Sequence, residues 1–159
     1  MTKLTIGVID LVCKGPTTTL WARAMHANLA SIMPQVVATW CEEEGHDVKL
    51  ICYTGLEDLR KELPKGVDLV FISAFTESAL LAYALSNYFR SQGAVTVLGG
   101  PHARCYPDDA VQYFDFVLGF TNQGTIQEVL HNCQPQRPEG KHLSAGKQPS
   151  HLPGVRERW

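Results

Sequence analysis

Short apolar runs alternate with stretches of helical periodicity along the first 133 residues of the chain. Five of these runs are rich in β-branched residues, and we expect strands at 3–11, 48–53, 68–75, 94–98 and 114–118. Each run is apolar almost throughout, which is typical of strands that are covered on both faces, as in a parallel sheet.

Between the strands, apolar residues recur at the spacing of amphipathic helices. Five helices are expected, and their marker residues are Trp21, Met25, Leu29 and Ile32; Val36, Val37 and Trp40 after Pro34; Leu81, Leu85 and Tyr88; Val111 and Phe114; and Ile126, Val129 and Leu130. Strands that alternate with helices predict right-handed crossovers. The predicted fold is α/β: a Rossmann-like (flavodoxin-like) doubly wound five-stranded parallel sheet.

The composition narrows the function classes. With 45% hydrophobic and 19% charged residues, the chain is neither disordered nor collagen-like nor a coiled coil. A net charge of −2 argues against nucleic-acid binding, and no apolar run is long enough to span a membrane. The five cysteines are scattered without a Cys-x-x-Cys pair, and no secretory signal is apparent, so free thiols and a cytoplasmic location are expected.

The last 26 residues differ from the rest. Residues 134–159 hold four of the nine prolines and carry five Lys/Arg against two Asp/Glu. We expect residues 1–133 to form the folded domain and residues 134–159 to be a basic linker towards a missing domain. The apolar and aromatic residues that return at its end, 152–159, support this expectation.

Ligands of doubly wound sheets bind outside the carboxyl ends of the strands. After the fourth strand, Gly99 and Gly100 remove two side chains where a ligand could lie against the backbone; the alternative is a tight turn. Ser73 holds the last inward position of the third strand, while Thr76 and Glu77, taken alone, are better explained as a cap and a favourable charge at a helix N-terminus.

Three short motifs coincide with these strand ends. They are Asp-x-Val-x-x-Gly at 10–15, Ser-x-Phe at 73–75, and Gly-Gly at 99–100. They match the cobalamin-binding pattern Asp-x-His-x-x-Gly, Ser-x-Leu, Gly-Gly except at the histidine, where Val12 stands, and at the leucine, where Phe75 stands. With the longer stretches 97–103, 106–110 and 114–119, residues 3–133 resemble the N-terminal cobalamin-binding domain of cobalamin-dependent radical-SAM enzymes.

The resemblance implies a module that binds cobalamin with the nucleotide base displaced from cobalt (base-off) and serves methyl transfer or related chemistry. The cofactor-binding residues that it implies are Val12, Cys13, Lys14, Thr17, Ser73, Phe75, Thr76, Glu77, Gly99, Gly100, Pro101, His102, Gly119 and Phe120. Val12 and Cys13 would lie near the lower face of the corrin, and Ser73 and Thr76 would hydrogen-bond the base or tail. His102 would contact a phosphate or amide of the tail.

The departures from the family limit what this chain could do alone. Val12 has no donor atom and could not serve as the lower cobalt ligand. The apolar residues at helical spacing within 21–32 indicate an inserted helix. No Cys-x-x-x-Cys-x-x-Cys is present, so S-adenosylmethionine and an iron–sulfur cluster are expected only on an absent radical-SAM domain or partner chain. No catalytic residue or protein metal ligand is predicted.

Other functions remain open at this point. A Cys13–His102 nucleophilic pair lacks a local oxyanion site, and a zinc site around His102 and Cys105 lacks paired ligand spacing. A receiver-like signalling domain would need an aspartate where Ser73 ends the third strand. A stand-alone cobalamin carrier or sensor would use the same ligand for another purpose.

Overall fold

The computed structural model describes residues 3–12, 31–133 and 141–144, and its centre is a parallel sheet. The strands are β1 (Thr5–Leu11), β2 (Asp47–Tyr53), β3 (Leu69–Ser73), β4 (Val95–Gly99), β5 (Phe116–Leu118) and β6 (Lys141–Leu143). They lie in the order β2-β1-β3-β4-β5-β6, and every neighbouring pair is parallel. The five expected strands and the doubly wound α/β fold are therefore confirmed.

The short strand β6 extends this sheet beyond the expected five strands. It pairs with β5 through the register Phe116↔Lys141, Val117↔His142 and Leu118↔Leu143. Leu143 is buried among the residues that pack beneath α7, which gives β6 an apolar anchor. Part of the segment that we expected to be a linker thus belongs to the sheet.

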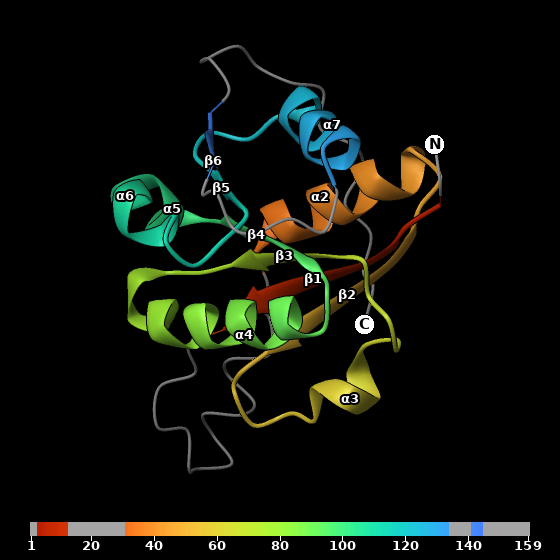
Figure 1. Ribbon diagram of the computed structural model, residues 1–159, viewed down its shortest axis with the longest axis horizontal. Coiled ribbons are helices and arrows are strands. Elements are labelled where there is room, and N and C mark those ends of the chain that lie inside the picture. The colour runs from red at the N-terminus through yellow and green to blue at the C-terminus, as the bar shows by residue number, and fades with distance from the viewer. Residues whose placement is uncertain (1–2, 13–30, 134–140, 145–159) are drawn as a thin grey trace.

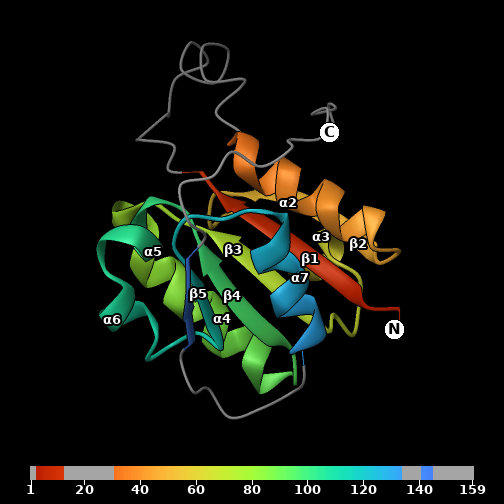
Figure 2. The same cartoon turned by 90° about the horizontal axis from the view of Figure 1, so that it is seen from above.

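Helices cover both faces of the sheet (Figures 1 and 2). One face carries α2 (Ile32–Glu43) and α7 (Gln123–His131), and the other carries α3 (Leu59–Glu62) and α4 (Ala79–Ser91). The short helices α5 (Pro101–Cys105) and α6 (Pro107–Ala110) follow β4, and the single turn η1 (Thr76–Ser78) precedes α4. Among the described residues, no helix is long and apolar enough to cross a membrane.

One expected helix is wrong in position. Val111 and Phe114 were expected to mark a helix, but the helix ends at Ala110 and residues 111–113 form a turn. Phe114 is nevertheless fully buried against the α4 face. Val111 and Phe114 are three residues apart because a turn between them returns the chain to the sheet. The same spacing occurs in a helix, so local periodicity cannot distinguish the two.

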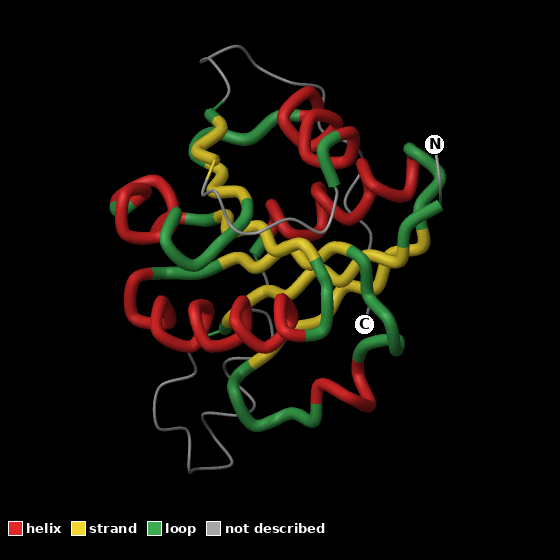
Figure 3. The backbone as a smooth tube through the Cα atoms, in the orientation of Figure 1, coloured by secondary structure: helices red, strands yellow, loops and turns green. Residues whose placement is uncertain are grey.

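The alternation of side chains along the strands decides which residues reach the same side of the sheet. Val8 of β1 and Phe71 of β3 pack beneath α2 and α7, whereas Ile9 and Ile72 pack against α4. The tube in Figure 3 shows the strands running side by side, so their carboxyl ends meet at one edge. The register pairs Asp10 with Ser73 and Ser73 with Gly99.

Candidate functional site

A cavity of about 210 Å³ lies at the carboxyl edge of the sheet, on the side covered by α2 and α7. Its floor is apolar, because Val8, Phe71 and Leu118 come from the strands and are almost fully buried. Ser73 and Thr121 add hydroxyl groups to the wall, and Arg104 adds a positive charge. The described residues that line the cavity are Val8, Met33, Pro34, Val37, Phe71, Ile72, Ser73, Gly99, Gly100, Arg104, Leu118, Gly119, Phe120 and Thr121.

The two glycines at the end of β4 differ in what surrounds them. At Gly100, whose φ is +92°, a Cβ would lie 2.8 Å from the Ala74 oxygen and 3.0 Å from the Ala74 nitrogen. Glycine is therefore required there by the backbone itself. At Gly99 a Cβ would meet nothing within 4 Å, and φ is not left-handed. Since Gly99 lines the cavity, its missing side chain leaves the cavity larger without relieving any contact in the protein.

Asp10 lies behind this wall, at the end of β1. Its side chain is 2% exposed and accepts a hydrogen bond from the backbone N–H of Ser31, with an N···O distance of 2.7 Å. Burial raises the pKa of the Asp10 carboxyl, and hydrogen bonds from Ser31 and from the Ser73 side chain counteract part of this effect. The carboxyl thus joins the first residue before α2 to the ends of β1 and β3.

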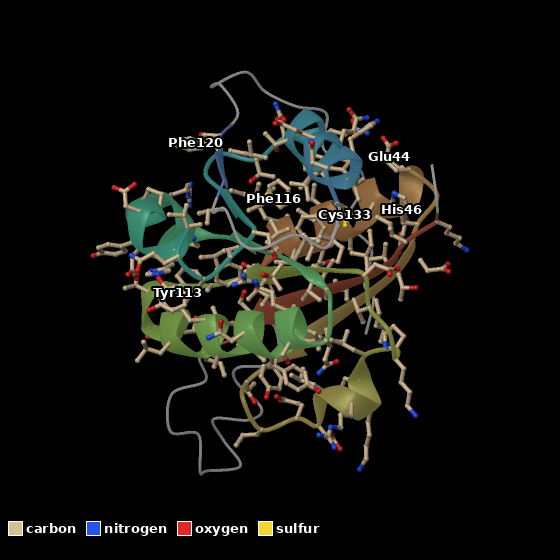
Figure 4. The ribbon with its side chains drawn as sticks, in the orientation of Figure 1. Glu44, His46, Tyr113, Phe116, Phe120 and Cys133 are labelled. Atoms are coloured by element: carbon tan, nitrogen blue, oxygen red, sulfur yellow. The ribbon has the colours of Figure 1, made fainter. Side chains whose placement is uncertain are left out.

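The rim of the cavity carries a paired cation and aromatic ring. The Arg104 guanidinium carbon lies 5.4 Å from the centre of the Phe120 ring, a distance typical of a cation–π interaction. Phe120 is 55% exposed, and Figure 4 shows it near β6 at the outer side of the loop that follows β5. Phe116, by contrast, lies between the sheet and α7.

The structure brings together some of the residues expected to bind a cofactor and separates others. Five of them line the cavity: Ser73, Gly99, Gly100, Gly119 and Phe120. The remaining described ones lie outside its lining: Val12, Phe75, Thr76, Glu77, Pro101 and His102. Cys13, Lys14 and Thr17 fall outside the described residues.

His102 does not lie where we expected it. Its ring is 4% exposed, with Nε2 2.7 Å from the Tyr83 hydroxyl and Nδ1 3.4 Å from the Thr76 hydroxyl. Because Tyr83 donates to Asp109 at 2.6 Å, the Tyr83 oxygen is left to accept from His102 Nε2–H. The imidazole therefore ties α4 and α5 together on the side of the sheet opposite the cavity, and the expected contact with a ligand phosphate has no support.

The buried position of His102 predicts a pH-dependent stability. Burial lowers the pKa of His102 below the ordinary 6.5, and the Asp109 charge offsets only part of this effect. As the pH falls, the unfolded chain therefore takes up a proton near pH 6.5, before the folded chain does. The contribution of neutral His102 to the stability of the fold is complete above pH 6.5 and is lost as the pH falls below it. His102→Gln should show a shallower loss of thermal stability between pH 7.5 and 5; an unchanged slope would contradict this prediction.

Metal-binding groups and the buried thiol of Cys41 bear on the chemistry open to the described residues. No group of three or more His, Cys, Asp or Glu side chains among them is arranged to hold a metal ion. Burial raises the pKa of the Cys41 thiol to about 12, with the nearby Glu42 and Glu44 adding to the effect. Such a thiol is a poor nucleophile at neutral pH. Cys13 of the Cys13–His102 pair considered above lies outside the described residues.

Comparisons with known proteins give no relative for this chain. No protein-family model matches it, and no curated protein and no solved structure is significantly similar to it. The function of the cavity therefore has to be inferred from its own residues.

Sequence reasoning missed part of the cavity. Met33, Pro34 and Val37 come from the first turns of α2, and their spacing indicated only a helix that packs on a sheet. Arg104 and Thr121 also line the cavity, and the sequence analysis assigned neither of them a role. One available signal was the position of Arg104, five residues beyond a strand-end glycine and therefore close to the same edge.

Proposed function

We propose that this chain is a cobalamin-binding module that holds the nucleotide tail of base-off cobalamin in the cavity at the carboxyl edge of the sheet. The observation that carries this proposal is Gly99. It lines the cavity, has an ordinary backbone conformation and has open space where its Cβ would be, so its glycine identity preserves room for a ligand. The sequence motif that suggested cobalamin has its glycine pair, Gly99 and Gly100, at this point.

The lining fits the chemistry of the tail. The dimethylbenzimidazole base is flat and largely apolar, and it would lie on the floor formed by Val8, Phe71 and Leu118. Ser73 and Thr121 would supply hydrogen bonds to the polar atoms of the tail. Cobalamin, when bound, supplies a cobalt centre for methyl or electron transfer. The reaction itself would need a radical-SAM domain, or a partner chain, carrying S-adenosylmethionine and an iron–sulfur cluster.

A visible spectrum tests this proposal. The protein is incubated with hydroxocobalamin, desalted and scanned, and we expect retained cobalamin with a base-off spectrum. A base-on spectrum would contradict the insertion of the tail into the cavity. No retention, combined with no spectral change in a titration with excess hydroxocobalamin, would contradict cobalamin binding altogether.

A further inference from the structure

The charge at the rim of the cavity has a bearing on which ligands can enter. Arg104 is the only charged residue among the described residues that line the cavity. The ion pairs of the described chain involve Lys3, Lys61 and Arg90, and none of them includes Arg104. The guanidinium is therefore a cation without a carboxylate partner in the described structure.

The environment of Arg104 holds it at the rim. Its guanidinium carbon lies 5.4 Å from the centre of the Phe120 ring, and a cation–π contact uses the positive charge of the group rather than its N–H donors. A guanidinium edge can donate two parallel hydrogen bonds to a carboxylate or phosphate. Cation–π contact thus orients Arg104 without consuming its capacity to bind an anion.

The described lining of the cavity holds no second cation that could bind a negative group. Asp10, which is buried, is the register neighbour of Ser73, and Ser73 lines the cavity wall. The floor beside them is apolar and offers no compensation for a buried anion. A ligand would therefore place its apolar part on the floor and its negative group at the rim.

We infer that the cavity selects an apolar group with an attached anion, and that Arg104 is the residue that binds this anion. The inference rests on the proposed function for the identity of the ligand. In cobalamin, the dimethylbenzimidazole base is linked through ribose to a single negatively charged phosphodiester. The apolar base would lie on the floor of the cavity, and the phosphodiester would lie at its rim. The residue expected to contact the phosphate is then Arg104 and not His102.

Fluorescent probes test the charge preference independently of cobalamin. 8-Anilinonaphthalene-1-sulfonate is an apolar anion, and N-phenyl-1-naphthylamine is its neutral analogue. We expect the folded protein to bind the sulfonate more tightly than the neutral probe. Arg104→Met should lower the affinity for the sulfonate about tenfold and change the affinity for the neutral probe less than twofold. Arg104→Lys should restore part of the affinity. Arg60→Met removes an exposed arginine of α3 and should leave both probes unaffected.

Site occupancy is checked with Gly99→Val, which narrows the cavity and should weaken both probes. If Arg104→Met lowers the affinity for both probes equally, the inference is overturned. Such a result would show that the substitution changes the shape of the cavity and not its recognition of charge. Absence of sulfonate binding in the unmodified chain, or binding that Gly99→Val leaves intact, would also overturn it.

A second comparison separates this inference from the proposed function. Arg104→Met should weaken hydroxocobalamin about tenfold and leave cobinamide, which lacks the phosphodiester and base, unchanged. If the unmodified chain binds no cobalamin but shows the Arg104-dependent preference for the sulfonate, the cobalamin proposal fails and the anion preference stands. If cobalamin binds and Arg104→Met changes neither cobalamin nor the sulfonate, the inference fails and the proposed function stands.

Discussion

Gly100→Ala is expected to destabilise the protein by about 3 kcal/mol, because the new Cβ would meet backbone atoms in a conformation that alanine rarely adopts. The φ and ψ angles of Gly100 are 92° and −174°. The Cβ would lie 2.8 Å from the Ala74 oxygen and 3.2 Å from Ser73 Oγ. Urea unfolding followed by circular dichroism measures the change.

Ala74 cannot move away cheaply, since its backbone is hydrogen-bonded on both sides. Its N–H donates to the Gly99 oxygen at 3.1 Å, and its carbonyl accepts from the His102 N–H at 3.1 Å. These two bonds join the ends of β3 and β4 to the start of α5, so a displaced Ala74 would also disturb the cavity wall.

Gly93→Ala is the matched control for this substitution. Gly93 also has a positive φ, of 88°, but a Cβ there would have nothing within 4 Å. The control should therefore cost only the backbone strain, about 1 kcal/mol. If the two variants unfold at the same urea concentration, the close contact with Ala74 does not destabilise Gly100→Ala. The prediction that glycine is required at position 100 would then be wrong.

The sequence predicted the sheet well because each strand is apolar enough to be recognised alone. The runs around Ile6, Ile72 and Val97 are buried in the inner strands, and Ile51 is buried in the edge strand β2. The alternation rule then placed Ser73 and Gly99 on one side of that sheet, next to each other. This part of the cavity follows from local pattern and from the common direction of parallel strands.

The rest of the cavity depends on how separate elements pack. Met33 and Val37 reach it only because the first turns of α2 lie at the carboxyl edge of the sheet, and helix periodicity does not encode that placement. The orientation of the His102 side chain could not be predicted from the local pattern either. It comes two residues after the glycine pair, but the five-residue helix α5 places its ring where one nitrogen contacts the Tyr83 hydroxyl and the other the Thr76 hydroxyl. Strand β6 escaped prediction because a three-residue strand amid prolines carries almost no periodicity.

The adjacent glycine should behave in the opposite way. Gly99→Val is expected to weaken cobalamin retention at least tenfold while leaving the protein as stable as before, or more stable by about 0.5–1 kcal/mol. Valine is a better strand residue than glycine, and its side chain would meet no protein atom near the Cβ position. It would instead occupy the cavity that is proposed to hold the nucleotide tail.

Equilibrium dialysis with hydroxocobalamin and thermal unfolding measure the two effects on the same samples. Lys49→Val, which places the same side chain at an exposed position of β2, should retain the cofactor as the unmodified chain does. Lost retention together with lost stability would mean that Gly99 serves the fold. Full retention with a stable Gly99→Val protein would show that the tail does not occupy this cavity. Only separation of the two properties, with binding lost and stability kept, fits a glycine whose missing side chain makes room for a ligand.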